Sequence, residues 1–370
     1  MTSAETRGLE SYWRADFPGE VSIPVARPRL PSTDEIAPYL RRIDESQWYS
    51  NNGPLVEEFE QRLANHFGGG MTKVATVANA TIGLAVTLLA YELPRETLCM
   101  VPAWTFAATG HAIELAGLTP WIVDVDLTSW ALEPAMAHQF LRHAPGKVSA
   151  VVPVSPFGAP IDYASWESFR DETGIAVAID SAAAFDTLRP TALPAIVSLH
   201  ATKLLGVGEG GFVLSTDADF IEEIQKRTNF GFWNTRESTA RSLNGKISEY
   251  AAAVGLAALD SWKNIRADFE RVARAYRASN ATLQEGFGDR WVSSTVMIST
   301  NDADAAEQAL SARGIGSRRW WGGGLHRHSA FNEFPRASTE NSDSLANRVI
   351  GLPCWRDLPN QTIAEICAAV

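Results

Sequence analysis

Seven short apolar runs, rich in β-branched residues, alternate with longer helix-forming stretches between residues 73 and 215. Most of them are continuously apolar rather than alternating with polar residues, which is typical of strands covered by helices on both faces of a sheet. The runs are 73–78, 97–103, 121–125, 148–154, 175–180, 195–200 and 211–215. This pattern predicts an α/β fold with a mainly parallel sheet of about seven strands between helices.

The sequence changes in character on either side of this region. Residues 1–24 have no sustained periodicity and predict an N-terminal arm on the surface. After about residue 250 the pattern becomes that of one long helix, followed by shorter strands at 294–299 and 349–352. We therefore expect an arm, a large domain (25–254) and a smaller C-terminal α+β domain (255–370).

Composition excludes several classes of function. The net charge of −11 argues against general binding to nucleic acid or anionic membranes, which needs a basic surface. No run of about 18 apolar residues predicts a membrane span, and the first residues contain no apolar signal segment, so we expect a cytoplasmic protein. The three cysteines are far apart, and no metal site is predicted.

Lys203 follows the sixth apolar run and precedes the glycine-rich stretch Gly208-Glu209-Gly210-Gly211. Ligands of α/β sheets collect at the carboxyl ends of strands, and a lysine desolvated there has a lowered pKa that suits Schiff-base chemistry. A single lysine in such a position is more often structural. The functional interpretation therefore needs support from other residues.

Asp180 ends the run 175–180 and brings a carboxylate to the same edge of the sheet. A carboxylate after five apolar residues needs a cationic partner. The protonated pyridine nitrogen of pyridoxal 5'-phosphate is such a partner, and an aspartate opposite it keeps the ring an effective electron sink. The ordinary alternative is an aspartate that caps a helix or lies in a loop.

Two further strand ends carry candidate ligand contacts. After the run 73–78, the start of a helix at Thr81 and Ile82 offers backbone N–H groups and a hydroxyl to a phosphate, although an ordinary capped helix looks the same. Trp104 and Phe106 follow the run 97–103 and suit stacking on a flat cofactor ring. Packing in the core explains aromatic residues there equally well.

Together these elements resemble the DegT/DnrJ/EryC1/StrS family of sugar aminotransferases, which have the aspartate-aminotransferase fold, known as fold type I. The resemblance covers nearly the whole chain, and its motifs occur in the family's order. They are Pro24-Val25-Ala26-Arg27-Pro28, Asn51-Asn52-Gly53-Pro54-Leu55, residues 102–109, Gly117-Leu118-Thr119-Pro120, Asp124-Val125-Asp126, residues 198–211, Asn229-Phe230-Gly231 and Asn244-Gly245-Lys246-Ile247-Ser248-Glu249.

The resemblance implies catalytic and ring-binding roles by position. Lys203 is expected to bind pyridoxal 5'-phosphate as a Schiff base and to act as general base. Asp180 is expected to pair with the pyridine nitrogen. Phe106 is the expected ring-stacking residue, and Trp104 is the second choice.

The resemblance also implies how the cofactor phosphate is held. Thr81, the amide of Ile82 and Ser198 are expected to contact it within one chain. Asn244 is expected to reach the same phosphate from the other subunit of a homodimer. Each active site would then be shared between two subunits.

Ala183 departs from the family pattern. The family usually follows its aspartate with Ala-Ala and then a Gln or His that hydrogen-bonds the phenolic oxygen of the cofactor. Here Asp180-Ser181-Ala182-Ala183 supplies no such side chain. Either another group or water takes this place, or the electronics of the cofactor differ from those of the family.

Lys203 also discriminates between functions. Family members that dehydrate a sugar have histidine at this position, so lysine favours transfer of an amino group, from an amino acid such as glutamate to a nucleotide-linked keto-sugar. A non-catalytic cofactor-binding protein of the same fold is the alternative from another class. The motifs at 27–31 and 51–54 look most like members acting on dTDP-4-keto-6-deoxy-hexoses. C3 keto-sugars and cyclitol ketones stay open.

The segment Ser317-Arg318-Arg319-Trp320-Trp321-Gly322, which leads to His326, combines cations with flat aromatic surface. Such a segment suits a diphosphate and a base or sugar. Packing at a joint between domains is an equally good explanation. The candidate substrate contacts are Trp104, Arg319, Trp321 and His326.

Overall fold

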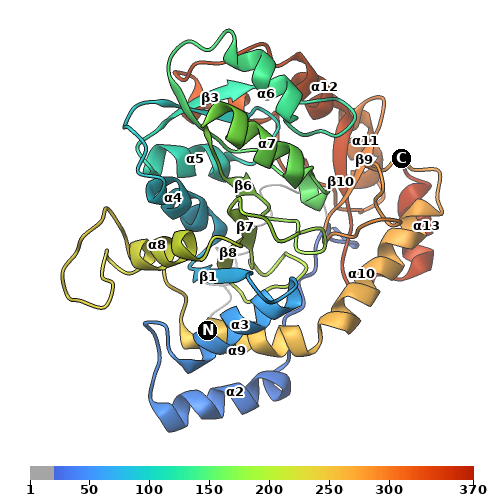
Figure 1. Cartoon of the computed structure of the whole chain (residues 1–370). Helices are drawn as coiled ribbons and strands as arrows, with labels where there is room; N and C mark the ends of the chain where they lie inside the picture. Colours follow the sequence, from blue (N-terminus) through green and yellow to red (C-terminus); the bar gives the residue numbers. More distant parts are fainter. Residues whose placement is uncertain (1–20) are drawn as a thin grey trace, which may run out of the picture.

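The computed structural model describes residues 21–370 (Figure 1), so most of the predicted N-terminal arm lies outside the described residues. Its central sheet consists of β1 (Lys73–Val77), β2 (Leu98–Pro102), β3 (Thr119–Val123), β4 (Val148–Val151), β5 (Ala176–Val177), β6 (Ile179–Asp180), β7 (Ala195–Ser198) and β8 (Gly211–Ser215). The strands form two sets, with orders β3-β2-β4-β5 and β1-β8-β7-β6.

The two sets are parts of one sheet, because β5 and β6 are halves of a single extended segment. Between them, the Ala178 N–H donates to the Val151 carbonyl at 3.1 Å. The neighbouring strands run parallel except for β8, which is antiparallel to both β1 and β7. The predicted mainly parallel α/β sheet of about seven strands is confirmed in the described residues.

Apolar residues on both faces of the strands explain their continuously apolar sequences. Along the β5–β6 segment, Ala176 and Ala178 pack into one core while Val177 and Ile179 pack into the other. The sides of successive residues alternate along a strand, so both sides need apolar residues when both faces are covered. Strands β2 and β8 are buried over their whole length.

Helices supply the other side of each core (Figure 1). One core includes residues of α4 (Ala80–Ala90), α5 (Ala107–Leu115) and α8 (Ala218–Thr228). The other includes residues of α3 (Pro54–His66), α6 (Pro134–Leu141), α7 (Tyr163–Thr173), α9 (Glu249–Asp260) and α10 (Trp262–Arg277), while α2 (Thr33–Ser46) packs against α9. The helices cover the faces of the sheet, and loops with polar residues such as Thr105 and Lys203 follow the carboxyl ends of strands β2 and β7.

The C-terminal part contains the antiparallel pair β9 (Val296–Ser299) and β10 (Val349–Leu352). Its further helices are α11 (Ala303–Ser311), α12 (Glu340–Arg348) and α13 (Asn360–Cys367), with short 3-10 turns η2 (Leu325–Arg327) and η3 (Ser329–Phe331). Another such turn, η1 (Pro156–Gly158), follows β4.

The single long helix expected after residue 250 is wrong, because the structure divides it into α9 and α10 at Ser261. This residue leaves helical geometry, with φ −93° and ψ 3°. Partners differ across the break, since α9 packs against α2 and α3 whereas α10 packs against α13. The boundary at 254/255 therefore falls inside α9, and the division into two domains stays a prediction.

The N-terminal segment joins the C-terminal part far away in sequence. Ile23 pairs with Ile315 and Ala26 pairs with Cys354, both in parallel bridges. The Cys354 N–H donates to the Val25 carbonyl at 3.0 Å. This pairing carries the residues after Ala26 across the molecule toward the sheet.

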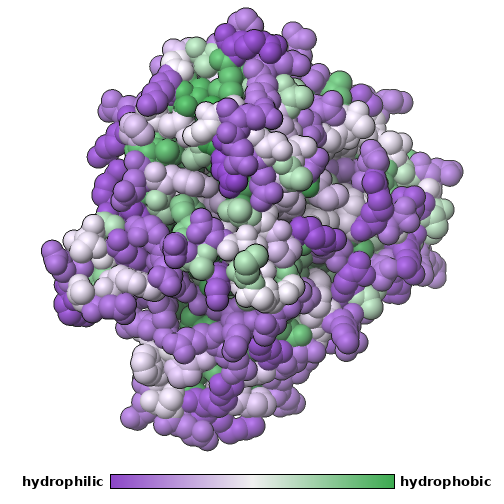
Figure 2. All heavy atoms as spheres, in the orientation of Figure 1, coloured by the Kyte–Doolittle hydropathy of each residue, from purple (hydrophilic) through white to green (hydrophobic). Residues whose placement is uncertain are grey.

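The face seen in Figure 2 is mostly hydrophilic, with apolar residues in small groups between hydrophilic ones. Within residues 21–370, no helix is both long enough and apolar enough to cross a membrane.

Candidate active site

Lys203 lies in a tightly folded loop after β7. The Leu199 N–H donates to the Gly210 carbonyl at 2.9 Å, and the Lys203 N–H donates to the His200 carbonyl at 2.8 Å. Gly208 has φ +99°, a left-handed conformation that favours glycine. These bonds fix the backbone from which the lysine projects.

Asp180 ends β6 with a buried carboxylate. Its Oδ2 accepts a hydrogen bond from the Thr109 hydroxyl at 2.8 Å, and its Oδ1 accepts one from the Ala182 N–H at 3.1 Å. The Thr109 hydroxyl lies 2.8 Å from that of Thr105, and both threonines are 1% exposed. Among residues 21–370, no cation forms an ion pair with Asp180 within 4 Å, so the carboxylate is free to pair with a bound cation.

Burial acts in opposite directions on Asp180 and Lys203. Desolvation raises the pKa of the Asp180 carboxyl, and the hydrogen bonds from Thr109 and Ala182 and the positive charge of Lys203 partly oppose this. Desolvation lowers the pKa of the Lys203 amine, and the charge of Asp180 partly opposes that. A lysine with a lowered pKa offers a neutral, nucleophilic amine at lower pH than an exposed lysine.

Ser198 and the start of α4 are brought together by a close backbone approach at Gly211. Ser198 is the partner of Gly211 across β7 and β8. A Cβ on Gly211 would lie 2.9 Å from the Ala80 nitrogen, so only glycine fits here. The Ser198 hydroxyl accepts from the His200 N–H at 3.2 Å and keeps its own proton for another acceptor.

The start of α4 matches the predicted phosphate site in part. The Asn79 side chain caps this helix by accepting from the Ile82 N–H at 2.9 Å, so the Ile82 amide already has a partner. Within the described chain, no hydrogen bond involves the Thr81 hydroxyl. The Thr81 hydroxyl and the Ser198 hydroxyl are therefore the donors most available to a phosphate.

Asn244 lies on the rim of the same region with an exposed side chain. Its neighbour Gly245 accepts a hydrogen bond from the Ala78 N–H at 2.6 Å, directly before α4. Asn244 also pairs with Asn229 in an antiparallel bridge. The side chain of Asn244 is therefore exposed at this rim.

The two aromatic candidates lie in different environments. Phe106 precedes α5 and is 56% exposed, whereas Trp104 is 2% exposed. The Trp104 ring packs edge-on against Trp321 at 5.4 Å and Phe157 at 6.3 Å between centroids. Phe106 therefore has ring surface available for a ligand, and Trp104 has packing partners.

Of the other predicted substrate contacts, Arg319 and His326 are held by carboxylates. Arg319 pairs with Asp304 and donates to the Ala346 carbonyl at 2.7 Å. His326 is 3% exposed, and its Nε2 lies 2.9 Å from Asp343 Oδ1. These contacts favour packing at a joint between elements.

Trp321 and Ala183 remain partly exposed near the loop that follows β4. Trp321 stacks on Phe157 with centroids 3.9 Å apart. The Ala183 carbonyl approaches Gly158 of the same loop so closely that a Cβ there would lie 2.5 Å away. The side chain of Ala183 is only a methyl group, so no side chain at position 183 donates to a cofactor oxygen.

Sequence reasoning missed Thr105 and Thr109. They are four residues apart in sequence, with Thr105 just before the N-cap residue Phe106 and Thr109 in the first turn of α5, and their hydroxyls are 2.8 Å apart. This spacing after a strand was a usable signal, but only the fold shows that Asp180 is the partner.

A buried carboxylate, a desolvated lysine and a helix start at one edge of a mainly parallel sheet are the arrangement expected of a pyridoxal-phosphate enzyme of fold type I. The chain belongs to the DegT/DnrJ/EryC1/StrS aminotransferase family, which matches residues 32–370. It is thus a pyridoxal-phosphate-dependent aminotransferase, and the predicted family, activity and cofactor are confirmed.

The similarity to known proteins covers almost the entire chain. "Protein Rv3402c" of Mycobacterium tuberculosis (strain ATCC 25618 / H37Rv) is 29% identical, covering 94% of this chain and 89% of that protein. The "dTDP-4-amino-4,6-dideoxy-D-glucose transaminase" of Escherichia coli is 28% identical, covering 93% and 97%. The solved structure of DesI with its TDP-sugar product is 30% identical with a TM-score of 0.84, covering 95% and 93%.

The residues present fit pyridoxal 5'-phosphate. Asp180 is a buried carboxylate in need of a cation, and the Thr81 and Ser198 hydroxyls suit a phosphate at the start of α4. Asp180 ends β6 and Lys203 follows β7, and these two strands are parallel neighbours, so the carboxylate and the lysine come from the same part of the sheet edge. When bound, the cofactor supplies an aldehyde that takes up amines and a protonated ring that accepts electrons.

Proposed function

We propose that the enzyme transfers the amino group of glutamate to a dTDP-4-keto-6-deoxy-hexose. Glutamate is oxidised to 2-oxoglutarate, and the keto carbon of the sugar is reduced to a carbon bearing the amino group, so no other oxidant or reductant is needed. Lys203 beside Asp180 carries the proposal, because dehydrating relatives lack the lysine. The named transaminase and DesI relatives support the sugar class.

Lys203 and Asp180 divide the chemistry between them. The neutral Lys203 amine removes the proton from the α-carbon of the donor and returns a proton at the sugar carbon that receives nitrogen. Asp180 keeps its negative charge with the help of the Thr109 hydroxyl and holds the proton on the ring nitrogen of the cofactor. The alternative function is a non-catalytic protein that binds the cofactor. Ala183, which lacks the family's usual side-chain donor, is the one residue that favours it. A protein without catalytic activity would not need a desolvated lysine, so Lys203 argues against it.

Glutamate is expected to change the visible absorption of the cofactor-loaded enzyme, and a dTDP-4-keto-6-deoxy-hexose is expected to restore it. Absorption spectra recorded with each compound in turn measure both halves of the reaction. Nucleotide-linked C3 keto-sugars and scyllo-inosose serve as controls for the sugar. A spectrum that glutamate leaves unchanged, with cofactor bound, contradicts amino transfer from glutamate.

We also propose a homodimer with shared active sites. Aromatic residues with 46–48% exposure flank the segment that contains Asn244. Tyr49 and Tyr250 stack at 6.3 Å, and Phe230 lies beneath the Lys246 ammonium at 4.7 Å. Grouped exposed aromatic residues are characteristic of protein interfaces. The predicted cytoplasmic location stays a prediction.

Mixing two inactive variants tests the shared site. Lys203→Ala and Asn244→Ala are each expected to be poorly active, whereas mixed dimers regain activity. The reason is that one of their two sites combines the intact Lys203 of one chain with the intact Asn244 of the other. Co-expression with two different affinity tags isolates the mixed dimers, and their kcat is compared with that of each parent.

The control for the mixing experiment is a double variant carrying both substitutions in one chain, mixed with wild type. In the shared-site model each of its two sites contains a single defect, so these mixed dimers are expected to stay poorly active, whereas sites built within one chain would leave the wild-type site intact. Verified mixed dimers that stay inactive, while Asn244→Ala alone is impaired, would show that Asn244 acts within its own chain.

A further inference from the structure

A narrow pocket has Lys203 in its wall and three arginines around it. Its lining includes Arg27, Arg29, Lys203, Phe269, Trp355 and Arg356. These residues come from the N-terminal segment, the lysine loop, α10 and the segment after β10. The pocket therefore connects the lysine loop of the candidate active site with segments that have no predicted role.

The segment that contains Arg27 and Arg29 is held from two sides. The bridge between Ala26 and Cys354 fixes the segment directly before Arg27. On the other side, a Cβ at Gly206 of the lysine loop would lie 3.0 Å from the Leu30 side chain, so this loop packs closely against the residue after Arg29. The segment that contains Arg27 and Arg29 thus lies between the lysine loop and the C-terminal part.

The pocket carries an excess of positive charge in an acidic protein. Its lining contains no carboxylate, although the chain has a net charge of −11. Arg356 is 16% exposed and is oriented by Asp268, whose Oδ2 lies 2.8 Å from its Nη2. Among the described residues, no hydrogen bond or ion pair involves Arg27. Guanidinium groups of this kind bind carboxylates and phosphates in two-pronged geometry.

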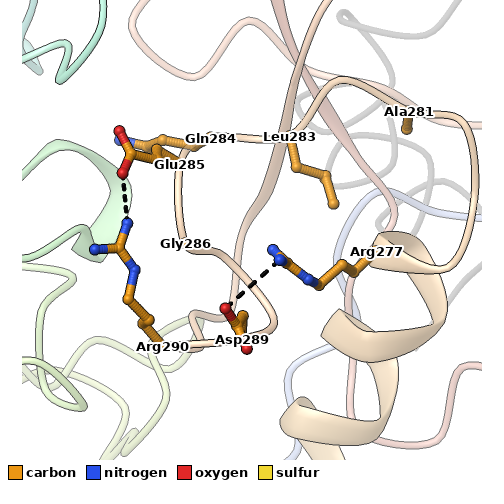
Figure 3. A pocket seen from close by; sticks show the side chains of 8 residues that line it. All are labelled: Arg277, Ala281, Leu283, Gln284, Glu285, Gly286, Asp289 and Arg290. Atoms are coloured by element: carbon orange, nitrogen blue, oxygen red, sulfur yellow. Dashed lines mark hydrogen bonds and ion pairs between the residues drawn. The ribbon is translucent and has the colours of Figure 1, made fainter.

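A larger pocket elsewhere shows the opposite arrangement (Figure 3). It has a volume of about 540 Å³ and contains no residue of the candidate active site. Its arginines point at carboxylates, with Arg290 Nη2 2.6 Å from Glu285 Oε1 and Arg277 Nη2 3.5 Å from Asp289 Oδ2. These charges cancel within the pocket, so Arg290 provides a matched control for the arginines near Lys203.

The size of the pocket near Lys203 distinguishes between anions. Its volume is about 20 Å³, and a single water needs about 10–15 Å³. This space suits one carboxylate group and is too small for a nucleoside diphosphate. A carboxylate bound here would lie against the loop that carries Lys203.

We propose that Arg27, Arg29 and Arg356 bind a carboxylate of the amino-acid donor. This inference rests on the proposed function, because it assigns the donor site of the same reaction. Arg356 provides a fixed guanidinium, and Arg27 provides one that has no competing partner among the described residues. The site selects a donor by its charge and places its amino group near Lys203.

Glutarate, a dicarboxylate without an amino group, is the probe for this site. Its affinity for the cofactor-loaded enzyme is measured by calorimetry, together with that of dTDP. Arg27→Gln and Arg356→Gln are each expected to weaken glutarate binding by about 10-fold or more, as for loss of a hydrogen bond to a charged group. The affinity for dTDP stays unchanged. Arg290→Gln is expected to bind both ligands like wild type.

Two further variants keep the test informative. Arg356→Lys, which keeps the charge, is expected to bind glutarate more tightly than Arg356→Gln. Arg27 is exposed, so Arg27→Gln gives an answer even if Arg356→Gln fails to fold. Weakened dTDP binding with unchanged glutarate binding would assign the pocket to the diphosphate and overturn the proposal. Unchanged binding of both ligands would overturn it as well.

Failure of the inference and failure of the proposed function give different results. If glutamate changes the wild-type spectrum but the arginine variants bind glutarate like wild type, the pocket proposal alone is wrong. If glutamate leaves the wild-type spectrum unchanged, the proposed function is wrong, whatever the arginines do to glutarate binding.

Discussion

Replacing Lys203 by alanine is expected to lower kcat by about 10⁴-fold, the upper part of the range for loss of a general acid–base group. The variant lacks both the amine that bonds the cofactor and the base that moves the proton at the donor α-carbon. Its fold should persist, because the lysine loop is held by backbone hydrogen bonds such as that from Leu199 to Gly210.

Reduction with borohydride, followed by peptide mass mapping, checks the assignment directly. Wild type is expected to carry a pyridoxyl group on Lys203, and the alanine variant none. Lys226 on α8, which pairs with Glu223 at 3.1 Å, provides a control lysine whose replacement by alanine leaves both labelling and kcat unchanged. Label on a different lysine of wild type would overturn the site.

The lowered pKa of Lys203 also predicts how the rate of cofactor uptake depends on pH. Burial disfavours the ammonium form, so the neutral amine appears at a lower pH than for an exposed lysine. Cofactor uptake by apoenzyme should therefore remain fast at pH values where a simple alkylamine is protonated and slow. Apoenzyme is mixed with cofactor across a pH series, and the rate of the absorption change is recorded.

The pattern of apolar residues along the sequence was enough to predict the strands. Continuous apolar runs gave the strands that end at Asp180 and before Lys203, because burial on both faces demands apolar residues at every position. The break at Ser261 was missed, since apolar periodicity continues through it from α9 into α10.

Contacts between distant residues could not be predicted in this way. The hydroxyl of Thr109 meets Asp180 across 71 residues of sequence, and Ala26 meets Cys354 across the length of the chain. Such partners follow from how the elements pack, which periodicity does not encode. Asn79 illustrates the same point on a small scale, because its cap uses the Ile82 amide that the family resemblance reserves for phosphate.

Asp180 provides the second large effect. Asp180→Asn is expected to retain the cofactor but to lower kcat by about 10²–10³-fold, since a charge-assisted partner in a buried site contributes several kcal/mol to the transition state. An amide carries no negative charge, so it cannot keep the proton on the ring nitrogen. The loss should appear in kcat rather than in KM for glutamate.

Thr109→Val tests the hydrogen bond that helps Asp180 stay ionised, because it removes the Thr109 hydroxyl and leaves the carboxyl group in place. Burial already raises the pKa of Asp180, and loss of the Thr109 hydroxyl raises it further by removing a hydrogen bond that favours the carboxylate. We expect kcat to fall by about 10-fold, as for loss of one hydrogen bond to a charged group. The activity of this variant should also fall off at a higher pH than that of wild type as the solution is acidified.

Thermal unfolding of the apoenzymes distinguishes this catalytic role from a structural one. In apoenzyme the Asp180 charge is buried with no ion-pair partner within 4 Å among the described residues, so Asp180→Asn removes an unfavourable charge and should not lower Tm. A catalytic aspartate thus predicts a large loss of kcat at unchanged or higher Tm. Asp180→Asn with bound cofactor and near wild-type kcat would show instead that this carboxylate only supports the fold, and the assignment of Asp180 to the ring nitrogen would be wrong.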